Sequence, residues 1–348
     1  MRDDDHPPGY RLERETRTAT DLLATPIDVI MILMISNSFR RGAVALGIAV
    51  LTITTGCSAP AGDDDSATSI VVGAYPFEFV ATRVAGDHAT VTNLLAPGSD
   101  GHDLELSPQQ VAAVSNADLV LYQSGYQAAL DEAVEQQSPA NVLDTASFLT
   151  LRTAAEDDDH DADDADDDHD ADEHGSYDPH VWLDPTNVAE IADHTAQLLS
   201  QLQPENADAF TANAQQLRSE LTTLDADFAS GLANCRTNTF ITSHTAFGYL
   251  AARYGLDQVG ISGLSPEEEP SPARIAQVQQ IATERDVTTI FYETAVSPKV
   301  SQAIASDLGL ATDVLDPIET LSSDSRGSDY IEVMNSNLDS LRKANGCQ

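Results

Sequence analysis

Three histidines and one aspartate lie in predicted loops and at predicted strand ends, where their side chains could bind a metal ion. His102 follows one predicted strand, His244 directly follows another, and His180 stands in a loop flanked by prolines. Asp316 comes directly after a further short apolar strand. Neutral imidazole and carboxylate groups suit Zn²⁺ in a four-coordinate site. If the fold brings these four side chains together, the chemistry that they predict is zinc binding.

These residues also have plainer interpretations. A single histidine in a loop is usually just solvated, and 78 and 64 residues separate the three histidines, so the sequence contains no short zinc motif. Glu293 also stands at the end of a predicted strand, where it either orients an imidazole or caps the next helix. His88 and His194 are expected to be surface or helix residues.

The elements that must position these side chains alternate between strands and helices. Short runs rich in β-branched and apolar residues predict strands at 69–74, 89–95, 118–123, 239–243, 258–261, 287–292 and 312–315. Helical patterns lie at 80–84, 107–114, 128–134, 187–202, 204–232, 246–254, 271–284, 300–308 and 330–343. This alternation predicts parallel α/β sheets. In such sheets ligands bind outside the carboxyl ends of the strands, where His102, His244 and Asp316 stand.

One helical pattern is long enough to connect two domains. A helix of about 27 residues within 204–232 would span roughly 40 Å at 1.5 Å per residue. We therefore predict an N-terminal α/β domain at 69–203, a linking helix at 204–232 and a C-terminal α/β domain at 233–348. The metal site is expected in the cleft between the two domains.

Composition and charge exclude several classes of protein. The chain has 348 residues, with 17 Lys and Arg against 57 Asp and Glu, and a formal net charge of −40. This charge excludes general nucleic-acid binding and argues against electrostatic binding to anionic lipid. It fits a cationic partner. Apolar residues at 41% exclude a wholly disordered chain. Three cysteines are too few for a disulfide scaffold or a four-thiolate zinc site.

The N-terminal region has the pattern of an export signal. Arg40 and Arg41 precede the apolar run 43–53, which is followed by small residues up to Cys57. Because a membrane span needs about 20 apolar residues, this run predicts a signal peptide within a leader at 1–56. Its Gly-Cys ending resembles a bacterial lipobox, which would make Cys57 a lipidated residue at the start of a tether, 57–68. Thr54 departs from the usual aliphatic residue of that motif.

An acidic segment interrupts the first predicted domain. Between 156 and 173, 13 of 18 residues are Asp or Glu, so we predict a disordered loop at 153–176. The segment also contains His160, His169 and His174. Either these side chains capture zinc weakly and raise its local concentration, or the segment is only a solvated insertion.

At these residues the chain resembles the zinc/manganese substrate-binding proteins of ABC importers. The motifs that carry the resemblance are DPHVWLDP at 178–185, SHTAFGYLAARYGL at 243–256, FYE at 291–293, SPK at 297–299 and LDP at 315–317. The resemblance covers nearly all of 69–345. It implies a metal site between two domains that a rigid helix joins, and delivery of the ion to a membrane permease.

The resemblance also implies the ligands and the metal. The expected set is His102, His180 and His244 with Asp316 or a water as the fourth ligand; Gly101 stands where some zinc members have an acidic residue. Manganese-type members commonly have Glu at the position of His244, and imidazole favours Zn²⁺ over Mn²⁺. We expect a monomeric, extracytoplasmic protein that binds Zn²⁺ as transported substrate, either anchored at Cys57 or periplasmic.

Three alternatives stay open at this point. The first is a manganese-binding member of the same family. The second is an envelope zinc hydrolase with three histidine ligands, an open water position and Glu293 as base. Against it, Asp316 is available as a ligand, and the sequence has no HExxH motif or nucleophile elbow. The third is a metal buffer or adhesin of the cell envelope that serves no transporter.

Two further cysteines predict a disulfide. Cys235 precedes the strand at 239–243, and Cys347 follows the last predicted helix. Outside the cytoplasm thiols oxidise, and a bridge between them would tie the final helix to the second domain. It would close a loop of roughly 110 residues and contribute up to about 4–5 kcal/mol. The alternative is two free thiols.

Overall fold

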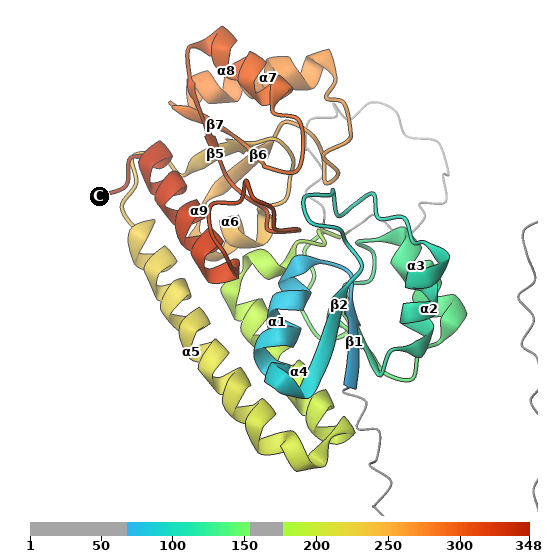
Figure 1. Ribbon diagram of the computed structural model, residues 1–348. Coiled ribbons are helices and arrows are strands. Elements are labelled where there is room, and N and C mark those ends of the chain that lie inside the picture. The colour runs from blue at the N-terminus through green and yellow to red at the C-terminus, as the bar shows by residue number, and fades with distance from the viewer. Residues whose placement is uncertain (1–67, 154–176) are drawn as a thin grey trace, which may run out of the picture. The chain divides into compact units, whose positions relative to one another are not determined.

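The computed structural model describes residues 68–153 and 177–348, drawn in colour in Figure 1. All of these residues belong to one compact unit. The predicted signal peptide, Cys57, and the histidines at 160, 169 and 174 lie outside the described residues. Within the described ranges, no helix is both long enough and apolar enough to cross a membrane.

The first half of the unit is a parallel four-stranded sheet with the strand order β2-β1-β3-β4. Its strands are β1 (Thr68–Val72), β2 (Ala89–Asn93), β3 (Leu119–Tyr122) and β4 (Val142–Asp144). Its helices are α1 (Tyr75–Ala85), α2 (Pro108–Asn116) and α3 (Ala128–Gln137). The predicted cap of α2 is present, because the Ser107 side chain accepts a hydrogen bond from the Gln110 amide. The three-residue strand β4 was not predicted.

The second half repeats this topology. Its parallel sheet has the order β6-β5-β7-β8. The strands are β5 (Thr239–Thr242), β6 (Asp257–Gly260), β7 (Thr289–Tyr292) and β8 (Ala311–Val314), and the helices are α6 (Gly248–Tyr254), α7 (Pro272–Glu284) and α8 (Lys299–Leu308). The prediction of two α/β halves with parallel sheets is therefore confirmed.

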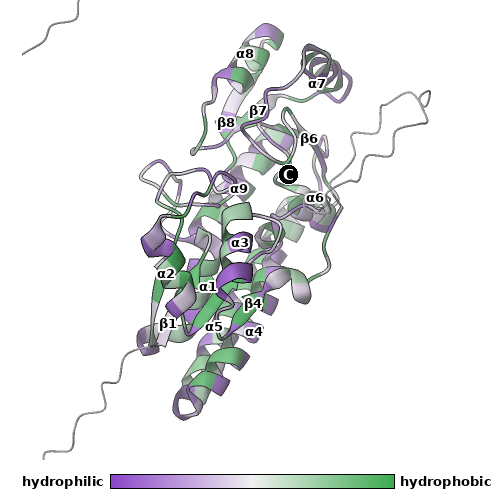
Figure 2. Cartoon of the chain, turned by 90° about the vertical axis from the view of Figure 1, so that its right-hand side faces the viewer, coloured by the Kyte–Doolittle hydropathy of each residue, from purple (hydrophilic) through white to green (hydrophobic). Residues whose placement is uncertain are grey.

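A long helix joins the two halves, as predicted. Helix α5 (Ala207–Gly231) has 25 residues and packs along α4 (Pro185–Leu202) (Figure 1). At 1.5 Å per residue it is about 37 Å long. It begins later than predicted, because Pro204–Asn206 forms a separate 3-10 turn. Hydrophobic and hydrophilic bands alternate along α4 and α5 in Figure 2. The exact limits of the domains stay a prediction.

One hydrophobic core crosses from the first half to the second. A single cluster of buried residues contains Phe77 of α1, Phe228 of α5, Phe240 of β5 and Tyr330 of the last helix, α9 (Tyr330–Asn345). Buried hydrogen bonds join the same regions. The Trp182 indole N–H donates to the Pro317 carbonyl at 2.7 Å, and the Tyr330 hydroxyl donates to the Trp182 carbonyl at 2.6 Å. The two halves are therefore packed together through a shared core.

The predicted disulfide between Cys235 and Cys347 is confirmed. It joins the segment after α5 to the segment after α9, across 112 residues of sequence. Backbone hydrogen bonds lie beside it, from Arg236 N–H to the Asn345 carbonyl and from Gln348 N–H to the Asn234 carbonyl. The final helix is thus fixed to the start of the second half by both covalent and hydrogen bonds.

Candidate metal centre

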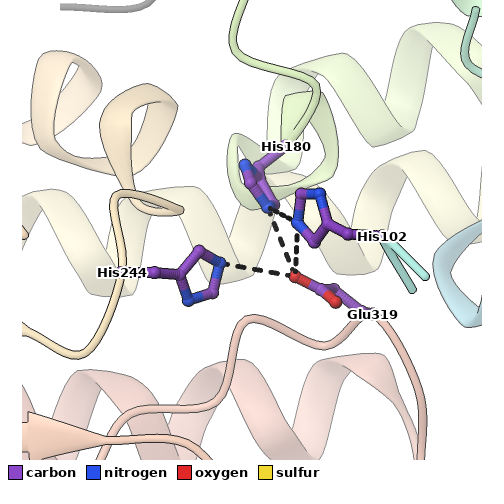
Figure 3. Close-up of side chains that lie close together, drawn as sticks. All are labelled: His102, His180, His244 and Glu319. Carbon is purple, nitrogen blue, oxygen red and sulfur yellow. Dashed lines mark hydrogen bonds and ion pairs between the residues drawn. The ribbon is translucent and has the colours of Figure 1, made fainter. Parts of the chain in front are cut away.

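Three imidazoles and one carboxylate converge between the two halves (Figure 3). The carboxylate oxygen Glu319 Oε1 lies 3.4 Å from His102 Nε2, 3.3 Å from His180 Nε2 and 3.5 Å from His244 Nε2. His102 Nε2 and His180 Nε2 are 3.2 Å apart. His180, His244 and Glu319 are buried, and His102 is partly buried. All four therefore offer one ligand atom each to the same small volume.

Each ligand comes from a different loop. His102 lies between β2 and α2, where its backbone N–H donates to Asp100 Oδ1 at 2.8 Å. His180 begins the 3-10 turn Val181–Leu183 that leads into α4, and His244 directly follows β5. Glu319 lies in the loop after β8. Except for His180, the ligands lie beyond the carboxyl ends of parallel strands, the usual place for a ligand site in such sheets.

Buried carboxylates orient two of the imidazoles from behind. His180 Nδ1 donates to Asp178 Oδ1 at 2.8 Å, and the same oxygen accepts the His180 backbone N–H at 3.0 Å. His244 Nδ1 donates to Glu293 Oε1 at 2.6 Å, and the Ser243 hydroxyl donates to that oxygen at 2.5 Å. When Nδ1 carries the proton of a neutral imidazole, the Nε2 lone pair faces the site and can bind a metal.

One ligand atom is left without a hydrogen bond. His244 Nε2 is buried and has no hydrogen-bond partner among the described residues. Buried polar atoms are nearly always hydrogen-bonded, so this nitrogen needs an explanation. A metal ion would provide the missing partner. Three imidazole nitrogens and one carboxylate oxygen are a donor set that fits four-coordinate Zn²⁺.

Without a metal, the site is held together by charge. Burial lowers the pKa of His244, but the Glu293 and Glu319 carboxylates outweigh burial and raise this pKa to about 10. Burial also opposes protonation of His180, and Asp178 and Glu319 raise its pKa overall. Burial raises the pKa of Glu319, but the three surrounding imidazoles hold this pKa well below its usual value. A metal that binds here must therefore displace protons.

The predicted ligand Asp316 is not part of this group, and Glu319 takes its place. Asp316 Oδ1 accepts the Ile318 backbone N–H at 2.8 Å, so the carboxylate folds back onto its own loop. Burial raises the pKa of Asp316 to about 6. The backbone turns at Ile318, which has a φ of 61°, and brings Glu319 to the imidazoles.

The two carboxylates behind the imidazoles belong to Glu293 and Asp178. Of the two interpretations of Glu293, its hydrogen bond to His244 agrees with the one in which it orients an imidazole. Asp178 was missed, although its place two residues before His180 is a usable signal. His88 and His194 do not belong to the group of four side chains. Their ring centroids lie 5.7 Å from that of Phe210 and 4.0 Å from that of Phe148, respectively.

A second group of carboxylates lies near the first loop. Asp100, Asp103 and Glu267 offer oxygens within 4.8 Å of one another. The group contains no imidazole, and Asp103 and Glu267 are exposed. Exposed acidic residues commonly gather without a metal, so the group is not assigned a function.

Comparison with known proteins gives matches over most of the chain. The family model described as "Zinc-uptake complex component A periplasmic" (ZnuA) matches residues 70–344. The high-affinity zinc uptake system protein ZnuA of Bacillus subtilis (strain 168) is 34% identical over 302 residues, which cover 84% of this chain and 93% of that protein. The zinc-binding lipoprotein AdcA of Streptococcus pneumoniae (strain ATCC BAA-255 / R6) is 33% identical over 286 residues, 80% of this chain. The match spans only 56% of AdcA, about half of its length.

Solved structures show the same fold. The laminin-binding protein Lmb of Streptococcus agalactiae, described as bifunctional with adhesin and metal-transporting activity, matches with a TM-score of 0.68 and 34% identity. A Zn(II)-bound mutant variant of AdcAII of Streptococcus pneumoniae matches with a TM-score of 0.69 and 30% identity. Each match covers 80% of this chain and 99% of the solved chain. With its two parallel sheets, its long connecting helix and the extent of these matches, this chain belongs to the ZnuA family of zinc-uptake components.

Proposed function

We propose that this protein captures Zn²⁺ outside the cytoplasm and delivers it to an ABC-type permease for import. The ion is held as transported substrate by His102, His180, His244 and Glu319. The observation that carries the proposal is the convergence of three Nε2 atoms on Glu319 Oε1, with the buried His244 Nε2 lacking a hydrogen-bond partner in the described part of the chain.

The ligand set favours zinc over manganese. Mn²⁺ prefers oxygen ligands in octahedral geometry, whereas three imidazoles and one carboxylate suit tetrahedral Zn²⁺. The relatives from Bacillus subtilis and Streptococcus pneumoniae, whose names refer to zinc, support the same choice. A manganese-binding protein is the alternative that metal analysis must exclude.

Capture is an exchange of protons for the ion. The carboxylates of Asp178 and Glu293 hold the imidazoles of His180 and His244 with Nε2 toward the site. Glu319 Oε1, which pairs with the imidazoles before capture, becomes a ligand afterwards. Because the ligand loops come from both halves of the unit, release to a permease requires only that those loops separate.

A binding protein fits the site better than a hydrolase. A catalytic zinc site keeps an open position for water and a nearby general base. Here Glu319 supplies a fourth protein ligand, and Glu293 is already engaged by the His244 imidazole and the Ser243 hydroxyl. Glu293 Oε1 therefore serves to orient His244, which supports a binding site over a hydrolytic one.

The proposal includes export and anchoring. The signal-like run 43–53, the lipobox-like ending at Cys57 and the name of AdcA as a lipoprotein support a lipid anchor outside the cytoplasm. The Cys235–Cys347 disulfide supports an oxidising compartment. In this proposal the protein acts as a monomer, and His160, His169 and His174 are weak accessory zinc sites.

Metal analysis tests the proposal. Purified protein is equilibrated with equal concentrations of Zn²⁺ and Mn²⁺, passed through a desalting column and analysed for both metals. We expect about one zinc per chain, the occupancy of a single four-ligand site, and little manganese. Preferential retention of manganese would contradict the proposal.

Zinc uptake by cells tests the role in transport. Deletion of the gene should reduce uptake, and the wild-type chain should restore it while the His244→Ala chain does not. A metal buffer or an adhesin without a transporter would leave uptake unchanged on deletion. Normal uptake in the deletion strain would therefore overturn the transport part of the proposal.

A further inference from the structure

Tyr126 carries a buried hydroxyl that the metal site described above does not use. The side chain is 5% exposed, and its hydroxyl has no hydrogen-bond partner among the described residues. Its ring lies edge-on to His102 with the centroids 4.9 Å apart, and it lies 6.1 Å from the His180 ring. Because buried hydroxyl groups are normally hydrogen-bonded, an unpaired one beside a metal centre calls for a role.

The hydroxyl fills the space that a side chain at position 101 would occupy. A Cβ atom built on Gly101 would lie 1.8 Å from the Tyr126 hydroxyl and 3.1 Å from Glu319 Oε2. Gly101 is therefore required where it stands, and the hydroxyl lies beside Glu319 Oε2. The Gln127 side chain holds this arrangement, since its Nε2 donates to the Gly101 carbonyl and to the Gly73 carbonyl, each at 2.9 Å.

The two oxygens of Glu319 consequently have different surroundings. Oε1 faces the three imidazoles at 3.3–3.5 Å. Oε2 accepts the Gly101 backbone N–H at 3.3 Å and lies next to the Tyr126 hydroxyl. Burial, and after it the nearby Glu319 and Asp100 carboxylates, raise the pKa of Tyr126 well above its usual value, so its hydroxyl is protonated at neutral pH and can donate. A hydrogen bond from the Tyr126 hydroxyl, added to that from the Gly101 N–H, would oppose the use of Oε2 as a second metal ligand.

The number of carboxylate oxygens that bind decides the coordination number. A carboxylate ligates a metal through one oxygen or through both. Binding through Oε1 alone gives four ligands with the three imidazoles, which suits Zn²⁺. Binding through both oxygens gives five ligands and moves the site toward the more oxygen-rich geometries that Mn²⁺ prefers.

We propose that Tyr126 is a positioning residue that sets metal selectivity. In the loaded site its hydroxyl donates a hydrogen bond to Glu319 Oε2, which keeps Glu319 bound through Oε1 alone. The site stays four-coordinate and favours Zn²⁺ over Mn²⁺. This inference rests on the proposed zinc function and names a residue that controls it.

The test variant is Tyr126→Phe, which removes only the hydroxyl. No donor or acceptor in the described part of the chain loses a partner, so we expect the variant to fold with a near wild-type midpoint of thermal unfolding. Co²⁺ serves as the probe of geometry, because four-coordinate Co²⁺ absorbs visible light more strongly than five- or six-coordinate Co²⁺. We expect strong absorption for the wild type and weaker absorption for Tyr126→Phe.

Competition titration of the same proteins measures selectivity. We expect the ratio of Zn²⁺ to Mn²⁺ affinity to fall by about tenfold in Tyr126→Phe, the lower end of the effect of removing an outer hydrogen-bond partner. Tyr254→Phe is the matched control, because the Tyr254 hydroxyl donates to Asp225 at 3.0 Å on the long helix, away from the site. That variant should keep the wild-type spectrum and ratio.

Several outcomes would overturn the inference. One is an unchanged cobalt spectrum or an unchanged affinity ratio in Tyr126→Phe. Another is an equal loss of Zn²⁺ and Mn²⁺ affinity, which would indicate a merely structural role. X-ray absorption of the zinc-loaded wild type provides a test that needs no variant, and five ligands would contradict single-oxygen binding. Failure of the wild type to bind zinc at all would instead overturn the proposed function.

Discussion

Each of the two fully buried imidazoles has one carboxylate behind it and another in front. Asp178 and Glu293 hold Nδ1 of His180 and His244, and Glu319 faces both Nε2 atoms. The carboxylates behind fix the direction of each ring. The carboxylate in front pairs with the imidazoles when no ion is bound and can become a ligand when one is. This arrangement gives each residue near the centre a distinct and testable contribution.

Loss of the His244 imidazole should abolish tight zinc binding. Removing an outer partner of a metal ligand typically weakens affinity about 10–100-fold, so His244→Ala, which removes a ligand, should exceed about 100-fold. Competition titration with a chelator of known affinity measures this loss. His194→Ala is the control, because His194 stacks on Phe148 at 4.0 Å instead of facing the centre. Equal losses in the two variants would disprove the assignment.

The choice between Glu319 and Asp316 can be tested in the same assay. Glu319→Gln replaces a charged ligand oxygen with a neutral amide and should weaken zinc binding strongly. Asp316→Asn keeps the shape of a side chain whose Oδ1 accepts the Ile318 N–H, and it should bind zinc within about tenfold of the wild type. A larger loss in Asp316→Asn than in Glu319→Gln would restore Asp316 as the fourth ligand.

The raised pKa of His244 gives the centre a pH dependence. In the metal-free protein, burial lowers this pKa but Glu293 and Glu319 raise it to about 10. The unfolded value is about 6.5, so the His244 ion pair stabilises the metal-free fold fully below pH ~6.5, and this contribution is lost as pH rises through about 10. Zinc must displace the proton, so zinc affinity should rise with pH over that window.

Proton release provides the measurement. Zinc added to weakly buffered protein at neutral pH should release protons that an indicator dye detects, and His244→Ala should release fewer. Zinc binding that releases no protons and has the same affinity at pH 6.5 and pH 8.5 would contradict the charge assignment.

At the scale of the elements, most strands and helices could be predicted because buried parallel strands are continuous apolar runs. Residues 69–74 overlap the observed strand β1, and residues 287–292 contain the observed strand β7. Strand β4 escaped prediction because three residues carry too little pattern. Glu319 escaped for a different reason: its position depends on contacts with residues far away in sequence. Its backbone carbonyl accepts the Tyr75 N–H at 3.0 Å, and its side chain accepts the Gly101 N–H.

The disulfide joins two elements and should stabilise the whole second half. Closing a loop of this length contributes about 4–5 kcal/mol in the chain-entropy account. The Cys235→Ser/Cys347→Ser double variant should therefore unfold at a lower denaturant concentration than the oxidised wild type. Its zinc affinity should change little, because the bridge lies after α5 and α9 and holds no ligand. Identical unfolding of the wild type with and without reductant would contradict this expectation.

At the scale of the whole molecule, the centre joins two halves that already share a core. Phe77 and Phe240 belong to the same buried cluster, although they come from the first and second sheets. The halves therefore do not need the metal in order to stay together. Zinc binding adds stability through mass action alone, by about 4 kcal/mol at a thousandfold excess over its dissociation constant.

We expect removal of the acidic segment to leave this arrangement intact. Thr153 and Tyr177 pair in an antiparallel bridge, and the Asp178 N–H donates to the Arg152 carbonyl at 2.9 Å. Deletion of 156–174 leaves four residues, Ala154, Ala155, Gly175 and Ser176, to connect the bridged positions. Loops of this length commonly close antiparallel pairs, so Asp178 and His180 should keep their places.

The deletion variant should retain one tightly bound zinc and lose weaker zinc binding. The tight site depends on four residues outside the deleted segment, whereas His160, His169 and His174 are removed with 13 acidic residues. Isothermal titration of both proteins with zinc separates the two classes of site. Loss of the tight site would contradict the assignment of the centre, because none of its ligands is deleted. Retention of all weak zinc binding would show instead that the segment is only a solvated insertion. The weak binding would then depend on the rest of the acidic surface.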